Sequence, residues 1–376
     1  MLFRSLSKAI PLPDRDAAEQ SLDAAEAAAK KVPQDCAAAL AVAFANLELA
    51  RALPPESQNT ALIRQDALRA AERAAPLAKD DEQTWLSAAV RGIVHAMAGE
   101  LDVAREFAEV GMHRFVPEST RDAAPYWVAD LLRAAARSHA AAAYQKAQQD
   151  PQADLSPLLS RANYAFSLLL DHHAATDTDL REAAACLAFG GHRHAAQAVL
   201  LGGIARFSGS NDVHADYRNR VAIDRGAAGL RAAYQTYLNG VCSRSGDTST
   251  PRWFGGYAYL VAAEMFVKDH NQSQAKASYT EAIAQFANSA AANPGFADSA
   301  NHFAVFAHTG LALLLHEQGN DQDAVAHLVA ARKLRPASMT DADGLGRKPQ
   351  AVLERIAQQL AAAGKQDLAD QLTKPQ

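Results

Sequence analysis

The stretch LLLHEQGNDQDAVAHLVAARKLRP, residues 313–336, decides the fold. Gly319 divides it, and glycine is the residue that most readily adopts the positive φ of a tight turn after a helix. Beyond the glycine, Ala324, Leu328 and Ala331 recur at intervals of four and three, which places them on one face of a helix. A proline ends the stretch, as prolines commonly end helices. The pattern predicts two antiparallel helices joined by a short turn.

Three further stretches fit the same frame of about 34 residues. They cover residues 84–117, 178–208 and 255–287, with Gly99, Gly191 and His270 at the turn. The frame resembles the tetratricopeptide repeat (TPR), in which helix A and helix B of each unit form a hairpin. The resemblance implies an all-α fold: an antiparallel helix-hairpin array, a TPR-like α-solenoid. The turns are not spaced by multiples of 34 residues, so further helices are expected between the units and the array is irregular. His308, on helix A of the last unit, is the one residue there that departs from the frame's small and apolar pattern.

Polar and proline-rich clusters divide the chain. The cluster DPQADLSP at 150–157 predicts a boundary between an N-terminal helical region, 1–150, with one TPR-like unit, and a C-terminal helical region, 151–376, with the others. Further helices are expected at 121–149, with Pro125 in the first turn, at 212–239 and at 348–363. Two loops are expected as well: 239–256, in which Thr250 caps the next helix before Pro251, and 339–350, a flexible linker.

Composition excludes several classes of protein. The 376 residues carry a net charge of −5, with acidic and basic residues mixed along the chain, so no nucleic-acid partner is expected. No apolar run reaches the roughly 18 residues of a membrane span. Cys36, Cys186 and Cys242 are far apart and unpaired in pattern, which predicts free thiols in a reducing compartment, the cytoplasm.

Motifs for catalysis and metal binding are incomplete. His316 and Glu317 begin an HExxH pattern, but Asn320 stands where the second histidine of a zinc site belongs. No GxSxG motif and no P-loop occurs. The pairs His172–His173 and His192–His194 invite a metal hypothesis, but neighbours on a helix point about 100° apart. We therefore expect no catalytic residue, no cofactor and no metal site.

Two sets of residues are candidates for binding a partner. The TPR resemblance implies a concave groove lined by helix A, and its lining positions carry over to Arg181, Tyr257, Leu260, Glu264, Lys268, Phe306, Thr309, Leu313, His316 and Glu317. The loop SRSGDTSTPRWFGG supplies a second set: Arg244, Arg252, Trp253 and Phe254. Arginine and aromatic side chains dominate interaction hot spots, although Trp253 can equally serve as an anchor in the core.

Three functional hypotheses remain open. The first is a non-enzymatic interaction scaffold that binds a peptide or a partner protein in the helix-lined groove. The second is a helical enzyme or small-molecule binder with its site at the 244–254 loop. The third is a regulatory subunit whose helices cover a catalytic partner.

Overall fold

The computed structural model describes residues 14–112, 125–243 and 246–374, and this part of the chain is helical, without any β-strand. It forms two compact units, residues 1–206 and 207–376, each of which is considered by itself. In sequence, the division between the units falls after Arg206, and the helices on either side of the 150–157 turn pack against each other. The expected all-α array of helical hairpins is confirmed.

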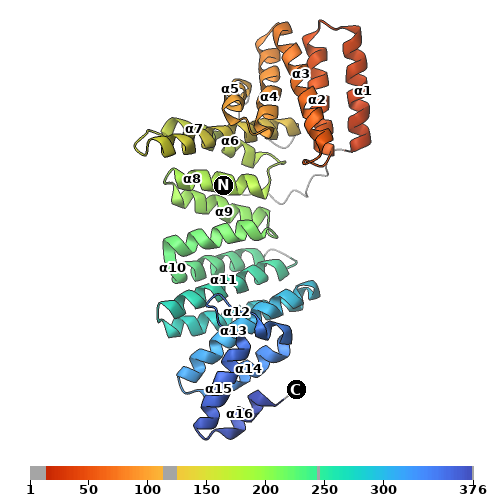
Figure 1. Ribbon diagram of the computed structural model, residues 1–376. Coiled ribbons are helices and arrows are strands. Elements are labelled where there is room, and N and C mark those ends of the chain that lie inside the picture. The colour runs from red at the N-terminus through yellow and green to blue at the C-terminus, as the bar shows by residue number, and fades with distance from the viewer. Residues whose placement is uncertain (1–13, 113–124, 244–245, 375–376) are drawn as a thin grey trace. The chain divides into compact units, whose positions relative to one another are not determined.

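Unit 1 consists of nine described helices, in which each helix packs against the next (Figure 1). They are α1 (Arg15–Lys31), α2 (Cys36–Ala52), α3 (Gln58–Ala74), α4 (Asp81–Met97), α5 (Leu101–Met112), α6 (Tyr126–Gln149), α7 (Ser156–Asp171), α8 (Asp177–Phe189) and α9 (Arg193–Arg206), with the 3₁₀ turn η1 (Ala75–Leu77) after α3. Pro125 was expected in the first turn of α6, but it is the N-cap residue just before that turn. The core is rich in alanine and leucine, which lets these helices approach closely.

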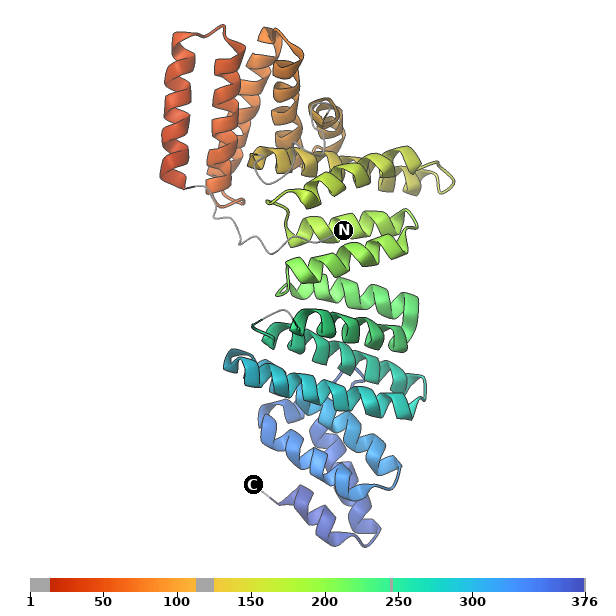
Figure 2. The ribbon, with the colours of Figure 1, turned by 180° about the vertical axis from the view of Figure 1, so that it is seen from behind.

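Unit 2 continues with α10 to α16 and is also built from successive hairpins (Figure 2). Its elements are α10 (Asn211–Cys242), α11 (Ser249–Lys268), α12 (Gln272–Ala292), η3 (Pro294–Phe296), α13 (Ala297–Glu317), α14 (Asp321–Leu334), η4 (Pro336–Thr340), α15 (Pro349–Ala362) and α16 (Gln366–Thr373). Aromatic side chains fill this core, and Tyr234, Tyr259, Tyr279 and Phe286 are fully buried. The short final hairpin of α15 and α16 was not expected from the sequence, which predicted a single closing helix.

One turn geometry recurs in both units and explains the spacing seen in the sequence. Gly99, Gly191 and Gly319 have φ values of 81°, 84° and 78°, and His270 takes the same place with φ 56°. At each turn the residue after the positive-φ residue donates its N–H five residues back, as Asn320 does to the carbonyl of Leu315 at 2.9 Å. The positive-φ residue itself donates its N–H to the carbonyl three residues back. Together the two bonds satisfy the last carbonyls of the helix. The four predicted hairpins α4–α5, α8–α9, α11–α12 and α13–α14 are therefore confirmed, and Gly364 repeats the turn in α15–α16.

Helix α10 is itself a hairpin, contrary to the single helix expected at 212–239. Gly226 has φ 64° and ψ −170°, a conformation that is essentially restricted to glycine. The His214 Nδ1 atom lies 3.2 Å from the Tyr234 hydroxyl, although 20 residues of straight helix would separate them by about 30 Å. The chain therefore reverses at Gly226, and the first half of α10 serves as helix A of a further unit.

The 239–256 loop is much shorter than predicted. Helix α10 extends to Cys242, and α11 begins at Ser249. The start of α11 is fixed by the Asp247 carboxylate, which accepts hydrogen bonds from the Ser249 N–H at 2.8 Å and from the Ser249 hydroxyl at 2.6 Å. Asp247, and not Thr250, provides the side-chain contact at the start of α11. Pro251 lies in the first turn, where its missing N–H has no helical partner to lose.

Candidate functional site

The helix-A face of unit 2 carries the candidate site; we use this term for the surface formed by the first half of α10 with α11 and α13. Helices α11 and α13 contact each other directly, as expected for the first helices of neighbouring hairpins. Two regions of this face differ in character. One carries partly exposed aromatic rings, and the other is covered by a later segment of the chain.

Three aromatic side chains and one arginine form what we call the aromatic cluster: Arg218, Trp253, Tyr257 and Phe303. The rings of Trp253 and Tyr257, one turn apart on α11, are nearly parallel with centroids 5.8 Å apart. Phe303 of α13 meets both of them edge-on, at 5.6 Å and 4.9 Å. The guanidinium of Arg218 lies 4.6 Å from the centroid of Tyr257, a cation–π contact. All four side chains are partly exposed.

The cluster is held in place from both sides of α11. The indole N–H of Trp253 donates to the Ser299 hydroxyl at 3.0 Å, which ties α11 to α13. Arg252 donates to Gln285 at 3.1 Å and to Thr248 at 3.2 Å, and so fixes the start of α11 against α12. The rings of Trp253 and Tyr257 are thus held in place before binding, so little side-chain entropy is lost when a partner contacts them.

Phe254 belongs to the core and not to an exposed site. It is 4% exposed and its ring stacks on His214 with centroids 3.6 Å apart. Burial lowers the pKa of His214 to about 3, so the imidazole is neutral and packs as a flat, weakly polar ring. Arg244 lies outside the described residues.

The C-terminal part of the helix-A face is largely covered. The groove positions Leu260, Phe306, Thr309 and Leu313 are 3%, 4%, 1% and 6% exposed. Helix α15 packs on α13, and His316 lies between Asp321 at 2.6 Å and Gln359 of α15 at 3.1 Å. His316 therefore joins hairpins and is not a free groove residue. Of the predicted groove residues, Lys268 at the end of α11 and Glu317 at the end of α13 are exposed.

Glu264 is covered by residues 341–347, which we call the strap. The N–H of Gly344 donates to Glu264 Oε1 at 3.1 Å, and Arg347 Nη2 donates to the Tyr279 hydroxyl at 3.0 Å. The sequence predicted a flexible linker here. No local pattern reveals the contact, because its two sides are 80 residues apart in sequence.

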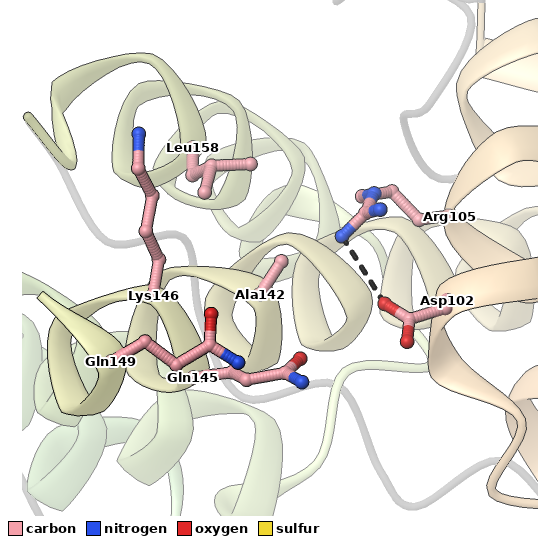
Figure 3. A pocket seen from close by; sticks show the side chains of 7 residues that line it. All are labelled: Asp102, Arg105, Ala142, Gln145, Lys146, Gln149 and Leu158. Atoms are coloured by element: carbon pink, nitrogen blue, oxygen red, sulfur yellow. Dashed lines mark ion pairs between the residues drawn. The ribbon is translucent and has the colours of Figure 1, made fainter. Parts of the chain in front are cut away.

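Arg181 lies on α8 in unit 1, so it is not part of the candidate site as defined here. Unit 1 has surface cavities of its own. One of 410 Å³ lies among α5, α6 and α7 (Figure 3) and is lined by Asp102, Arg105, Ala142, Gln145, Lys146, Gln149 and Leu158. Its charged groups have partners, since Arg105 pairs with Asp102 at 3.4 Å and Lys146 donates to the Asp154 carbonyl at 3.0 Å.

A further cavity, of 590 Å³, lies along α1, α2 and α3 and is lined by Glu26, Val42, Asn46, Asp66, Arg69, Glu72 and Arg73. Within the described ranges, no three His, Cys, Asp or Glu side chains converge as metal ligands. Nor does any helix of the described part have the length and apolar character to span a membrane.

The histidine that departed from the repeat frame has a partner on helix B. The Nδ1 atoms of His308 on α13 and His327 on α14 are 2.9 Å apart. One ring must donate and the other accept, so the contact requires at least one neutral imidazole. Burial lowers the pKa of His308 to about 4 and lowers that of His327 as well.

Comparison with known proteins gives distant matches of fold only. No family model and no curated protein sequence matches the chain. Among solved structures, the TPR domain of P58(IPK) is 14% identical, covers 93% of this chain and 95% of its own, and superposes with a TM-score of 0.22. Nro1, a nuclear import adaptor, is 12% identical over 85% of this chain and 94% of its own, with a TM-score of 0.33. The human IFIT1 dimer with m7Gppp-AAAA is 13% identical over 96% and 80%, with a TM-score of 0.27. At these TM-scores the matches carry no argument, and the repeat assignment rests on the hairpins and turns described above.

Proposed function

We propose that this chain is a non-enzymatic interaction scaffold that binds a peptide or a partner protein on the helix-A face of unit 2. The aromatic cluster is the observation that carries the proposal. Partly exposed aromatic rings with an adjacent arginine are the side chains that most often contribute large binding energies at protein interfaces. They come from three successive helix-A segments, so an extended partner that crosses the hairpins contacts all of them.

Other features agree with this function. The rings are fixed by hydrogen bonds and by each other, which reduces the entropy lost on binding. Lys268 extends the surface beyond the strap with a positive charge. All three cysteines are free thiols, which fits the cytoplasmic location that we propose with the function.

The alternative site at the 244–254 loop has less support. Arg252 and Phe254 are engaged in internal contacts, and residues 249–254 belong to α11. Both cavities described above lie in unit 1 and do not involve this segment.

A peptide-display selection on the full-length protein tests the proposal. Selected peptides are synthesised, and their affinities are measured for the wild type, Tyr257→Ala, Arg218→Gln and the control Ala232→Arg. Ala232 is exposed on the second half of α10, outside the aromatic cluster. We expect Tyr257→Ala to weaken binding by about 2 kcal/mol, roughly 30-fold, and the control to leave it unchanged.

Circular dichroism shows whether each variant retains its helical content. Peptides that bind Tyr257→Ala and Arg218→Gln as tightly as the wild type would place the recognition surface elsewhere. A selection that enriches no peptide above background would also contradict the proposal.

A further inference from the structure

The strap is a folded element rather than a linker. The Asp343 carboxylate accepts the N–H groups of Leu345 at 2.9 Å and of Arg347 at 2.8 Å, and it also accepts the Arg347 Nε at 2.7 Å. The backbone closes on itself as well, because the Asp343 N–H donates to the Arg347 carbonyl at 3.0 Å. The strap is thus a compact loop, preorganised around one buried aspartate.

Two contacts dock this loop on α11 and α12. They are the Gly344 N–H to Glu264 and the Arg347 guanidinium to the Tyr279 hydroxyl, described above. Glycine suits the first contact, since a Cβ at Gly344 would overlap Glu264 Oε2 and displace the carboxylate. The docking is therefore specific in shape and covers a position that would otherwise belong to the open helix-A face.

The docked strap places carboxylates in an unfavourable arrangement. Burial of Glu264 and, as a smaller effect, the neighbouring Asp343 carboxylate together raise the pKa of Glu264 to about 7. The Gly344 N–H, Arg347 and Lys268 act in the opposite direction. Tyr279 remains protonated, because burial raises its pKa to about 12. At the other end of the strap, Asp341 faces His302 of α13 at 3.8 Å.

We propose that the strap is a proton-controlled cover on the helix-A face, which docks more tightly when Glu264 takes up a proton and opens more readily when Glu264 ionises. In the open state Glu264 faces water and ionises as an ordinary carboxylic acid, near pH 4.5. In the docked state its ionisation is opposed by burial and by Asp343. Between about pH 4.5 and 7, docking of the strap is therefore accompanied by uptake of a proton on Glu264. The docked state becomes less stable relative to the open state as the pH rises through this range.

The proposal concerns the strap alone and holds or fails without any partner. Its consequence, that opening the strap exposes Glu264 to a ligand, rests on the proposed function of the helix-A face. The test below uses no ligand, so a negative result in the peptide selection and a negative result here are separate findings.

Hydrogen exchange of the strap amides, corrected for the intrinsic effect of pH, measures the opening directly. The full-length protein is compared at pH 5.0 and pH 7.5. We expect the opening equilibrium of Gly344 to rise by up to roughly 100-fold at the higher pH, because each unit of pKa difference contributes a factor of ten. In Glu264→Gln, which keeps an oxygen acceptor but has no charge, the opening should be independent of pH.

Two further variants complete the test. Glu281→Gln, a change on α12 at a carboxylate that pairs with Arg231 at 2.6 Å, is the control and should respond to pH like the wild type. Gly344→Ala should raise the opening equilibrium of the strap at both pH values without loss of helical content, because its Cβ displaces the Glu264 carboxylate. Equal protection of the wild-type strap at both pH values would overturn the proposal. A pH response that persists in Glu264→Gln would also overturn the proposal, because it would assign the pH dependence of the strap to His302 instead of Glu264.

Discussion

Arg133 of α6 joins three helices of unit 1 through buried charges, and its removal has a calculable effect. Its guanidinium donates to both oxygens of Asp179 at 2.6 Å and 2.7 Å, and to Asp130 at 2.6 Å. Asp179 is 0% exposed at the start of α8, where it also accepts hydrogen bonds from Thr176. Arg51 of α2 approaches Asp130 at 3.3 Å. This network orients α2, α6 and α8 with respect to one another.

The substitution Arg133→Met keeps the apolar part of the side chain and removes the charge. Two buried carboxylates then lose their closest partner, and breaking a buried ion pair in this way costs about 3–5 kcal/mol. The matched control is Arg137→Met on the same helix. Arg137 is 40% exposed and pairs with Glu182, which is 37% exposed, at 2.7 Å. It approaches Asp179 only at 3.7 Å, against 2.6 Å for Arg133, so its loss should cost no more than about 1 kcal/mol.

The pH dependence gives a second signature. In the wild type, Arg133 holds the pKa of Asp179 below its ordinary value despite burial, whereas burial raises the pKa of Asp130. The wild-type contribution of Asp179 is present above its unfolded pKa and is lost as the pH falls through its folded pKa. Without Arg133 the ionised form is no longer favoured, so the deficit of the variant should be largest near pH 7 and should shrink toward pH 4.

Native-state hydrogen exchange of α6 and α8 is the appropriate assay, because arrays of hairpins open locally and need not unfold in one step. The opening free energy of these helices is compared among the wild type, Arg133→Met and Arg137→Met. Equal losses below 1 kcal/mol in both variants would refute the assignment of Arg133 as the centre of the network.

The hairpin α13–α14 should become less stable in acid because of the His308–His327 contact. Both histidines have folded pKa values below that of free histidine, so their contribution to stability is complete above about pH 6.5 and is lost as the pH falls toward 4. For His308 alone the loss amounts to about 2–4 kcal/mol. Hydrogen exchange of residues 303–334 should show this loss in the wild type, and a double leucine variant that keeps the acid sensitivity would contradict it. At the recurring turn, His270→Gly should stabilise its hairpin and Gly319→Ala should destabilise its own by about 1–2 kcal/mol each, because both positions have positive φ. Thermal unfolding of both variants measures these effects, and shifts of the melting temperature with the same sign in the two variants would count against the turn geometry. Gly226→Ala should destabilise α10 by about 1–3 kcal/mol, since its backbone conformation is closed to side chains. Urea titration of this variant against the wild type measures the effect, and an unchanged midpoint would be incompatible with the reversal.

The repeat pattern was predictable from sequence because it depends on local rules. A glycine at a helix end and small residues at fixed offsets specify a hairpin wherever they occur, and even His270 was placed correctly at its turn. The loop before α11 was misjudged because Asp247, and not the more familiar Thr250–Pro251 pair, engages the helix start. The reversal at Gly226 was missed, although Gly226 and Gly229 both interrupt the predicted helix, because glycines inside a helical pattern are usually tolerated.

The candidate site was only partly predictable, for a different reason. Trp253 and Tyr257 stand one turn apart on one helix, so their proximity follows from sequence. Arg218 reaches Tyr257 only because α10 folds back, and Glu264 meets Gly344 only because the strap returns across the face. Such contacts depend on the packing of elements far apart in sequence, and no local pattern encodes them.

The central claim is that unit 2 is a run of helical hairpins whose first helices line one face, and the fold of α10 is its least expected part. Spin labels at Asn211 and Asn239, both exposed, measure it by electron–electron distance in a background where Cys242 is replaced by serine. A hairpin places the two helix axes about 8–10 Å apart and predicts a short distance between the labels. A distance of about 40 Å, the length of an uninterrupted helix over this span, would contradict the claim.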